Sequence, residues 1–162
     1  MKISKQALPD QALLQVYATR SDCFADCYTS TLKRPINLEA YVTAFYGTRL
    51  FRTERVILGA AGFPSTDTNL AALAKGQSDR FAAWRVEALE ADQILMCDRS
   101  GRTRSWLMIQ PEGAGTRLFF GSAVVPKEEG EELGFLFRAL LGFHKLYSRA
   151  LLRAARAALK SK

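Results

Sequence analysis

The stretch Phe81–Val125, FAAWRVEALEADQILMCDRSGRTRSWLMIQPEGAGTRLFFGSAVV, decides the fold class. It contains four runs rich in apolar, aromatic and β-branched residues, which are typical of strands. The connections between the runs are short and contain glycine, serine or acidic residues, and connections this short join antiparallel neighbours. The sequence therefore predicts a four-stranded antiparallel meander with strands at 81–89, 93–98, 103–110 and 116–125.

The chain continues from the meander into one long amphipathic helix, predicted from Glu131 or Leu133 to about Leu159. Glutamates at its start and arginines toward its end complement the helix dipole. The apolar side carries Phe137, Leu141, His144, Leu151, Leu152, Ala155 and Leu159. The opposite side is basic, with Arg138, Lys145, Arg149, Arg153, Arg156 and Lys160. We expect the apolar side to pack against the meander.

Ahead of the meander, the run CFADCYTSTL at 23–32 predicts a strand. Asn37 is a natural N-cap for a helix that continues at helical spacing through Leu38, Val42, Phe45, Arg49 and Arg52. A short second helix is expected between the caps Ser65, Thr66 and Asp67 and the terminating Gly76. The apolar patch 7–17 predicts a further short helix. This gives five strands, and one more is expected either near 52–59 or in the first 20 residues.

Strand, two helices, antiparallel meander and long C-terminal helix is the element order of the helix-grip fold. The strings AFYGTRLFRTERVIL, STDTNLAALAKG, FAAWRVE, TRSWL and GTRLFFGSAVVP resemble a bacterial family of unknown function with START-like, polyketide-cyclase-like folds. The resemblance spans about residues 22–155. It implies an α+β helix-grip domain, in which a curved antiparallel sheet wraps around the long C-terminal helix and leaves a cavity between them. We expect one START-like domain over 1–162, with 1–21 as an N-terminal extension.

One face of the predicted sheet is apolar and is assigned to the helix and the cavity, because burial of its side chains stabilises that face. Its members are Trp84, Val86, Ile94, Met96, Leu107, Ile109 and Phe119. The predicted function is binding of a small apolar or aromatic ligand by Trp84, Met96, Leu107, Phe119, His144 and Tyr147. The alternative is a cyclase- or dehydratase-like enzyme with His144 as general base and Tyr147 assisting it. The favoured interpretation of His144 itself is a structural one, either a core histidine bonded to a backbone carbonyl or a histidine at the rim of the helix.

The other face is mixed and too apolar for plain solvated surface. It is predicted to carry Arg85, Glu87, Cys97, Arg104, Trp106, Met108, Phe120 and Ser122. Within it, Arg85, Glu87, Arg104 and Trp106 fit an anion or aromatic-ligand site, because guanidinium groups hold carboxylates and stack on indole. A charge-paired outer face and one side of a homodimer interface fit the same residues. We predict a homodimer from this face.

The net charge of +7 is concentrated in one element. The segment 133–162 holds 7 of the 23 lysines and arginines and none of the 16 acidic residues, so the remaining 132 residues carry 16 basic and 16 acidic groups. The basic helix face is interpreted as solvated surface. Contact with anionic lipid or with nucleic-acid phosphates is a less favoured prediction.

Familiar catalytic and cofactor signatures do not occur in the sequence. The glycines lack the lysine and serine of a phosphate loop, and there is no two-histidine zinc-protease motif, G-x-S-x-G elbow or two-cysteine redox motif. We expect no cofactor and no metal. Cys23, Cys27 and Cys97 are an odd number without disulfide-framework spacing, and no segment is typical of a targeting or membrane-spanning sequence. The expected location is therefore the cytoplasm.

Overall fold

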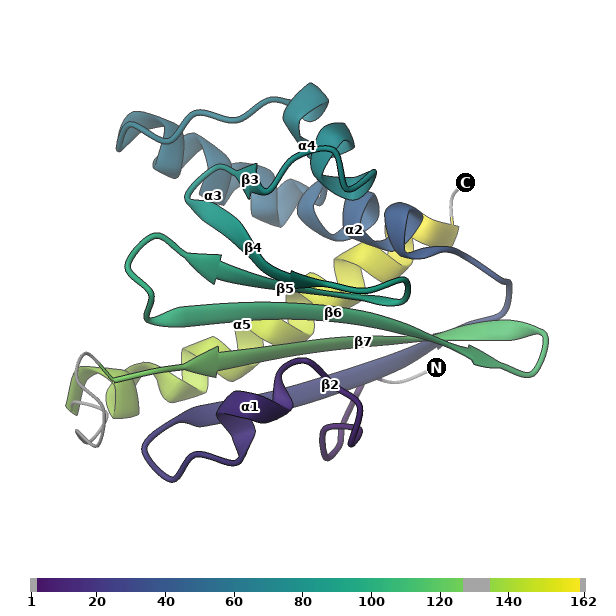
Figure 1. The fold of residues 1–162 in the computed structure, drawn as a ribbon, viewed down its shortest axis with the longest axis horizontal. Coiled ribbons are helices and arrows are strands. Elements are labelled where there is room, and N and C mark those ends of the chain that lie inside the picture. Colours follow the sequence, from purple (N-terminus) through teal and green to yellow (C-terminus); the bar gives the residue numbers. More distant parts are fainter. Residues whose placement is uncertain (1–2, 127–134, 161–162) are drawn as a thin grey trace.

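The computed structural model describes residues 3–126 and 135–160, with the side chains of 3–126 and 145–160. Its centre is a curved, antiparallel seven-stranded sheet in the order β1-β2-β7-β6-β5-β4-β3 (Figure 1). The strands are β1 (Ser4–Lys5), β2 (Phe24–Leu32), β3 (Arg80–Phe81), β4 (Trp84–Leu89), β5 (Gln93–Asp98), β6 (Thr103–Glu112) and β7 (Gly115–Val124). The helices are α1 (Gln15–Ala18), α2 (Leu38–Tyr46), α3 (Arg49–Ala60), α4 (Asp67–Ala74) and α5 (Phe135–Lys160). The chain is thus an α+β domain with a long C-terminal helix against the sheet.

The predicted meander is present as β4 to β7, and the strand at 23–32 is present as β2. The count of five strands was too low for two reasons. Lys5 belongs to a short strand, β1, that pairs with β2. The first run of the meander also divides at Ala82 and Ala83 into β3 and β4, which pair as a hairpin. The expectation of a strand near 52–59 was wrong, because this segment lies in α3.

The helical segment after Asn37 divides into two helices. Asn37 caps α2 as predicted, and its side chain accepts from the Ala40 amide at 2.9 Å. The chain leaves the helix at Gly47, and Thr48 starts α3 by accepting from the Phe51 amide at 3.2 Å. Spacing alone did not reveal this break, because the apolar period continues across it.

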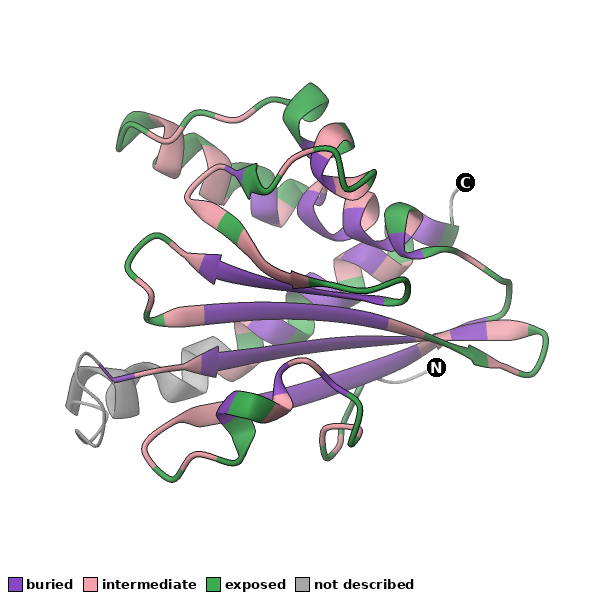
Figure 2. Ribbon diagram, viewed as in Figure 1, coloured by how far each residue is buried: buried purple, intermediate pink, exposed green. Residues whose placement is uncertain are grey.

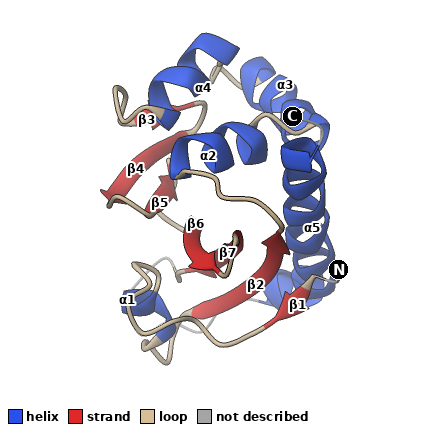
Figure 3. Ribbon diagram, turned by 90° about the vertical axis from the view of Figure 1, so that its right-hand side faces the viewer, coloured by secondary structure: helices blue, strands red, loops and turns tan. Residues whose placement is uncertain are grey.

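Helix α5 packs across one face of the sheet, which we call the inner face (Figure 3). Helix α2 also packs on the inner face, against β6 and α5, and α4 contacts α2 and the edge strand β3 (Figure 3). Helix α3 follows α2 and contacts α5. Within the described part of α5, the predicted apolar residues Leu151, Leu152, Ala155 and Leu159 are buried, as expected. They join a core formed with the inner face of the sheet and α2, including Tyr41, Phe45, Met96 and Leu107.

The opposite face, which we call the outer face, is covered by the chain's own N-terminal segment. Leu14 and Tyr17 of this segment pack on Trp106, Met108 and Phe119. The central strands β5 to β7 are consequently buried along most of their length (Figure 2). Part of the predicted extension, including Ala12, Leu14 and Tyr17, therefore packs against the sheet.

The strand register corrects the two predicted faces at β7. The β6–β7 hairpin has a two-residue turn at Gly113 and Ala114, so that Leu107 pairs with Phe120. The five-residue connection expected from the sequence placed the pairing one residue away, and a one-residue slip exchanges the faces. Phe120 and Ser122 therefore lie on the inner face, whereas Phe119 lies on the outer face.

Candidate functional site

The inner face carries a row of polar side chains within an otherwise apolar core. Asp26 is the Cα partner of Ser122, and Ser122 is the partner of Ser105, so the three cross β2, β7 and β6 in one line. All three are buried, with at most 7% of their surface exposed. Ser122 donates to the Asp26 carboxylate at 2.7 Å. Burial of such groups costs free energy unless they are hydrogen-bonded, so the core depends on the hydrogen bonds of this row.

The helices add three polar side chains next to this row. Tyr46 of α2 shares a hydrogen bond of 2.9 Å with Ser105. Tyr147 of α5 donates to the Glu54 carboxylate of α3 at 2.6 Å. We call the six residues the inner polar cluster: Asp26, Tyr46, Glu54, Ser105, Ser122 and Tyr147.

Burial controls the ionisation of this cluster. It raises the pKa of Glu54 above its ordinary value, and the hydrogen bond from Tyr147 opposes that shift in part. Burial also raises the pKa of Tyr147, and the bond to Glu54 raises it further. The pKa of Tyr46 is raised by burial, and the nearby Glu54 carboxylate adds to that shift. The tyrosines are therefore neutral hydrogen-bonding groups, and Glu54 is a carboxyl group suited to holding or exchanging a proton.

The members of the cluster differ in exposure. Asp26, Ser105 and Tyr46 are buried, whereas Glu54 and Tyr147 are half-buried where α3 meets α5. A molecule that approaches the inner face would therefore meet the Glu54–Tyr147 pair first. Among the described residues, no group of three His, Cys, Asp or Glu side chains has the geometry of a metal site.

The structure brings together part of the predicted ligand-binding set. Met96 and Leu107 are fully buried in the inner core, and Trp84 and Tyr147 are half-buried against it. Phe119 is not among them, because it points to the outer face, where its ring lies 6.1 Å from that of Trp106. The side chain of His144 lies outside the described residues.

The predicted group Arg85, Glu87, Arg104 and Trp106 separates into three environments. Arg104 and Glu87 form an ion pair at 2.9 Å. Tyr17 completes this contact, since its hydroxyl donates to Glu87 and accepts from Arg104 at 3.0 Å. Trp106 is fully buried and donates to Gln93 at 2.9 Å, whereas Arg85 is exposed. The chain's own N-terminal segment thus covers the face from which we predicted a homodimer, and the homodimer remains a prediction without an assigned surface.

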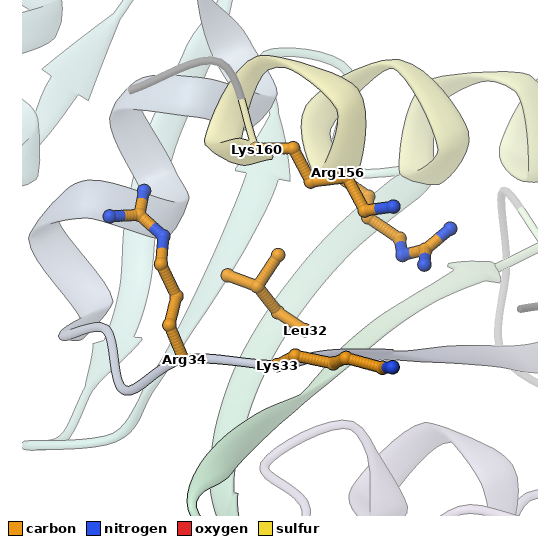
Figure 4. Close-up of a pocket in the computed structure, with 5 residues that line it drawn as sticks. All are labelled: Leu32, Lys33, Arg34, Arg156 and Lys160. Carbon is orange, nitrogen blue, oxygen red and sulfur yellow. The ribbon is translucent and has the colours of Figure 1, made fainter.

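Part of the basic helix face fixes the end of α5 to the sheet. Arg156 donates to the Thr31 carbonyl at 3.2 Å, and Arg34 donates to the Leu159 carbonyl in the last turn. Figure 4 shows Leu32 between these arginines and two lysines, at a surface pocket of about 350 Å³. These contacts stabilise a helix C-terminus, where carbonyl groups lack helical partners. Anionic lipid and nucleic acid remain predicted partners of this face.

Several residues of these sites escaped the sequence analysis, among them Asp26, Glu54 and Tyr17. Asp26 is the only charged residue in its apolar run, which was a readable signal of a buried polar site. Glu54 carried no such signal, because a glutamate on a charged helix is ordinary. Tyr17 belongs to a segment whose position on the outer face has no local sequence signature.

None of the described helices combines the length and the apolar character needed to cross a membrane. No protein-family model matches the chain, and no curated protein matches it. Among solved structures, it is similar to protein Ms6760 from Mycobacterium smegmatis, with 8% identity over 99% of this chain and 95% of that one and a TM-score of 0.43. CalU16 from Micromonospora echinospora is similar at 11% identity, over 99% of this chain and 92% of that one, with a TM-score of 0.34. A functional assignment therefore rests on the geometry of the chain itself.

Proposed function

We propose that this protein binds a small, mainly apolar or aromatic molecule between the inner face of the sheet and α5. The inner polar cluster holds the polar group of that molecule. The observation that carries the proposal is the polar row on an apolar face, continued to a half-exposed edge by Glu54 and Tyr147. Ligand sites typically combine apolar walls with a few convergent polar groups of this kind.

The alternation of the inner face supports an amphipathic ligand in particular. Met96, Leu107 and Phe120 supply apolar surface, and Trp84 adds a half-buried ring next to them. Because burial raises the pKa of Glu54, its protonated form, which donates a hydrogen bond as well as accepting one, persists to a higher pH than that of an exposed glutamate. A hydroxyl or carbonyl group on an otherwise apolar molecule suits this arrangement.

Native mass spectrometry of protein purified from a bacterial host tests the proposal. We expect an added small mass that disappears on denaturation. The variants Glu54→Gln and Tyr147→Phe should carry less of it, while Glu39→Gln, on the exposed start of α2, should carry as much as the unmodified chain. If no mass is bound, and neither dodecanoate nor 1-naphthol raises the melting temperature, the proposal is wrong.

Acid–base catalysis is a second candidate, favoured by the raised pKa of Glu54 beside the Tyr147 hydroxyl. A cyclase or dehydratase would remove one water from its ligand. The captured molecule, returned to fresh protein, would then lose the mass of one water, and Glu54→Gln would stop this loss. If the mass of the bound molecule never changes, the proposed catalysis is wrong and only the binding function is supported.

A further inference from the structure

The β3–β4 hairpin forms a second site, which contains no residue of the inner polar cluster, although its Trp84 also packs against the inner core. A pocket of about 350 Å³ lies against it, lined by Arg80, Arg85 and Arg99 with the rings of Phe63 and Trp84. No acidic residue contributes to the lining. A pocket of this size is large enough for a drug-sized or nucleotide-sized molecule.

Two of these arginines lie where their positive charges repel each other. Arg80 and Arg85 are direct Cα partners across the hairpin, and like charges in that position destabilise a sheet. Arg99 joins them because its backbone amide donates to the Ala83 carbonyl at 2.8 Å. Three arginines thus lie around the β3–β4 turn.

No carboxylate of the described residues forms an ion pair with these three arginines. Asp98 precedes Arg99, yet its carboxylate accepts from the amides of Arg102 and Thr103 at 2.9 Å, inside its own turn. Arg85 donates to the Cys97 sulfur at 3.9 Å, which is an uncharged acceptor. The positive charge of the pocket is therefore not neutralised within the described chain.

Aromatic rings complete the pocket. The Arg99 guanidinium lies 5.0 Å from the centre of the Phe63 ring, a stacking contact that orients its donors. Trp84 is half-buried, so part of its indole is accessible to a ligand. Ala82 also lines the pocket and has a φ of 52°, a left-handed conformation that costs free energy for any residue with a Cβ. Strain of this kind gathers at functional positions.

We propose that this pocket binds an aromatic molecule that carries a phosphate group, with the arginines on the phosphate and Trp84 against the ring. A phosphate dianion suits the pocket better than a single carboxylate, because three arginines line it. Guanidinium groups bind phosphate through paired donors. Aromatic side chains stack on nucleobases irrespective of sequence, so a nucleoside monophosphate is a suitable probe.

The test is titration of adenosine 5′-monophosphate at low salt, followed by tryptophan fluorescence. The chain has two tryptophans and Trp106 is fully buried, so quenching reports on Trp84. We expect saturable quenching, with ribose 5-phosphate and adenosine each binding about tenfold more weakly or worse, because each lacks one half of the recognised chemistry. Binding of ribose 5-phosphate is measured by calorimetric titration, because this molecule has no aromatic ring to quench the indole.

Variants separate this site from general attraction to a basic protein. Arg85→Gln and Arg99→Gln should each weaken binding about tenfold, whereas Arg102→Gln, an exposed arginine of the same β5–β6 turn outside the pocket, should not. Equal losses for Arg102→Gln and Arg85→Gln, or no saturable binding of the nucleotide, would overturn the proposal.

A stability measurement adds a signature that a purely structural role would not give. Without ligand, Arg85→Gln should raise the melting temperature at low salt, because it removes the repulsion with Arg80, and the gain should shrink as salt is added. Stability and affinity would then change in opposite directions. A lower melting temperature would mean that Arg85 is present for folding, and would contradict the proposal.

Discussion

At the scale of single residues, Gly121 of β7 is a tightly enclosed position in the middle of the sheet. A Cβ built there would lie 2.8 Å from both Leu14 Cδ2 and Trp106 Cε3 and 2.9 Å from the Asp26 carbonyl oxygen. Both faces of the sheet are filled around it, so nothing nearby can move freely. We expect Gly121→Ala to lower the free energy of unfolding by about 1–3 kcal/mol, measured by urea unfolding.

Gly59 provides the matched control for this prediction. It lies in α3, and its added Cβ would meet only the Pro64 Cα at 3.8 Å. Gly59→Ala should therefore stabilise the helix by about 0.5–1 kcal/mol, the ordinary difference between these residues in a helix. If both variants changed stability alike, the close packing around Gly121 would not be the cause.

A second residue-scale prediction concerns pH. Burial raises the folded-state pKa of Glu54 above its ordinary value of 4.5, so the unfolded chain releases this proton first as the pH rises. The contribution of Glu54 is therefore complete below about pH 4.5 and is lost as the pH rises through the higher folded pKa. The free energy of unfolding of the unmodified chain, relative to that of Glu54→Gln, should therefore fall as the pH rises from 4 to 7. Urea unfolding of both proteins measures this.

Tyr147→Phe tests the hydrogen bond that opposes this shift in the pKa of Glu54. The hydrogen bond from Tyr147 stabilises the charged carboxylate, so its removal should raise the pKa of Glu54 further. The chemical shift of the Glu54 carboxyl carbon, followed by NMR as a function of pH, measures this pKa directly. An unchanged pKa in Tyr147→Phe would show that the bond does not hold the carboxylate.

At the scale of elements, one amide connects the N-terminal segment to the sheet. Gln93 of β5 accepts from the Leu13 amide and from the Trp106 indole, both at 2.9 Å, and donates to the Gln11 carbonyl at 3.0 Å. Gln93→Leu would leave two buried donors without partners. We expect a loss of about 1–3 kcal/mol for each orphaned donor, measured by urea unfolding.

Gln110→Leu is the control for this loss, because Gln110 is exposed on neighbouring β6. Its effect should be within about 0.5 kcal/mol of zero. A comparably small effect of Gln93→Leu would mean that the N-terminal segment is held mainly by its other contacts, the apolar packing and the hydrogen bonds of Tyr17.

The sequence predicted elements well and their partners less well. Periodicity and turn residues located β5, β6, the long helix and the caps Asn37 and Thr66, because these signals are local. The assignment of β7 side chains to the inner and outer faces was wrong, because a difference of one residue in the pairing across the turn exchanges the two faces. The cover on Trp106 was missed because a tertiary contact between residues about 90 positions apart leaves no local pattern.

The candidate site shows the same limit more sharply. Met96, Leu107 and Tyr147 were predicted for the inner face and lie there. The carboxyl groups of Asp26 and Glu54 were not predicted, because their proximity to Tyr147 and Ser122 depends on how β2 and α3 are placed in the fold. The arginine pocket likewise depends on a hairpin between β3 and β4 that the sequence analysis interpreted as one strand.

At the scale of the whole molecule, stability should be unevenly distributed. Strands β6 and β7 are paired on both edges and covered on both faces, whereas α3 has one buried side chain, Phe51, and exposes Val56 and Ile57. Elements with few buried contacts open by local unfolding. We expect hydrogen exchange measured by mass spectrometry to be slowest in β6 and β7 and much faster in α3.

This uneven stability bears on the proposed function, because α3 supplies Glu54 to the inner polar cluster. A ligand held there would add contacts to the least stable cover of the inner face, and binding to the folded state alone stabilises it by mass action. Exchange in α3 should then slow when the captured ligand is added, while exchange in α4, which supplies no cluster residue, should stay the same. If exchange in α3 were as slow as in β6 without ligand, access to the inner face could not depend on opening of this helix.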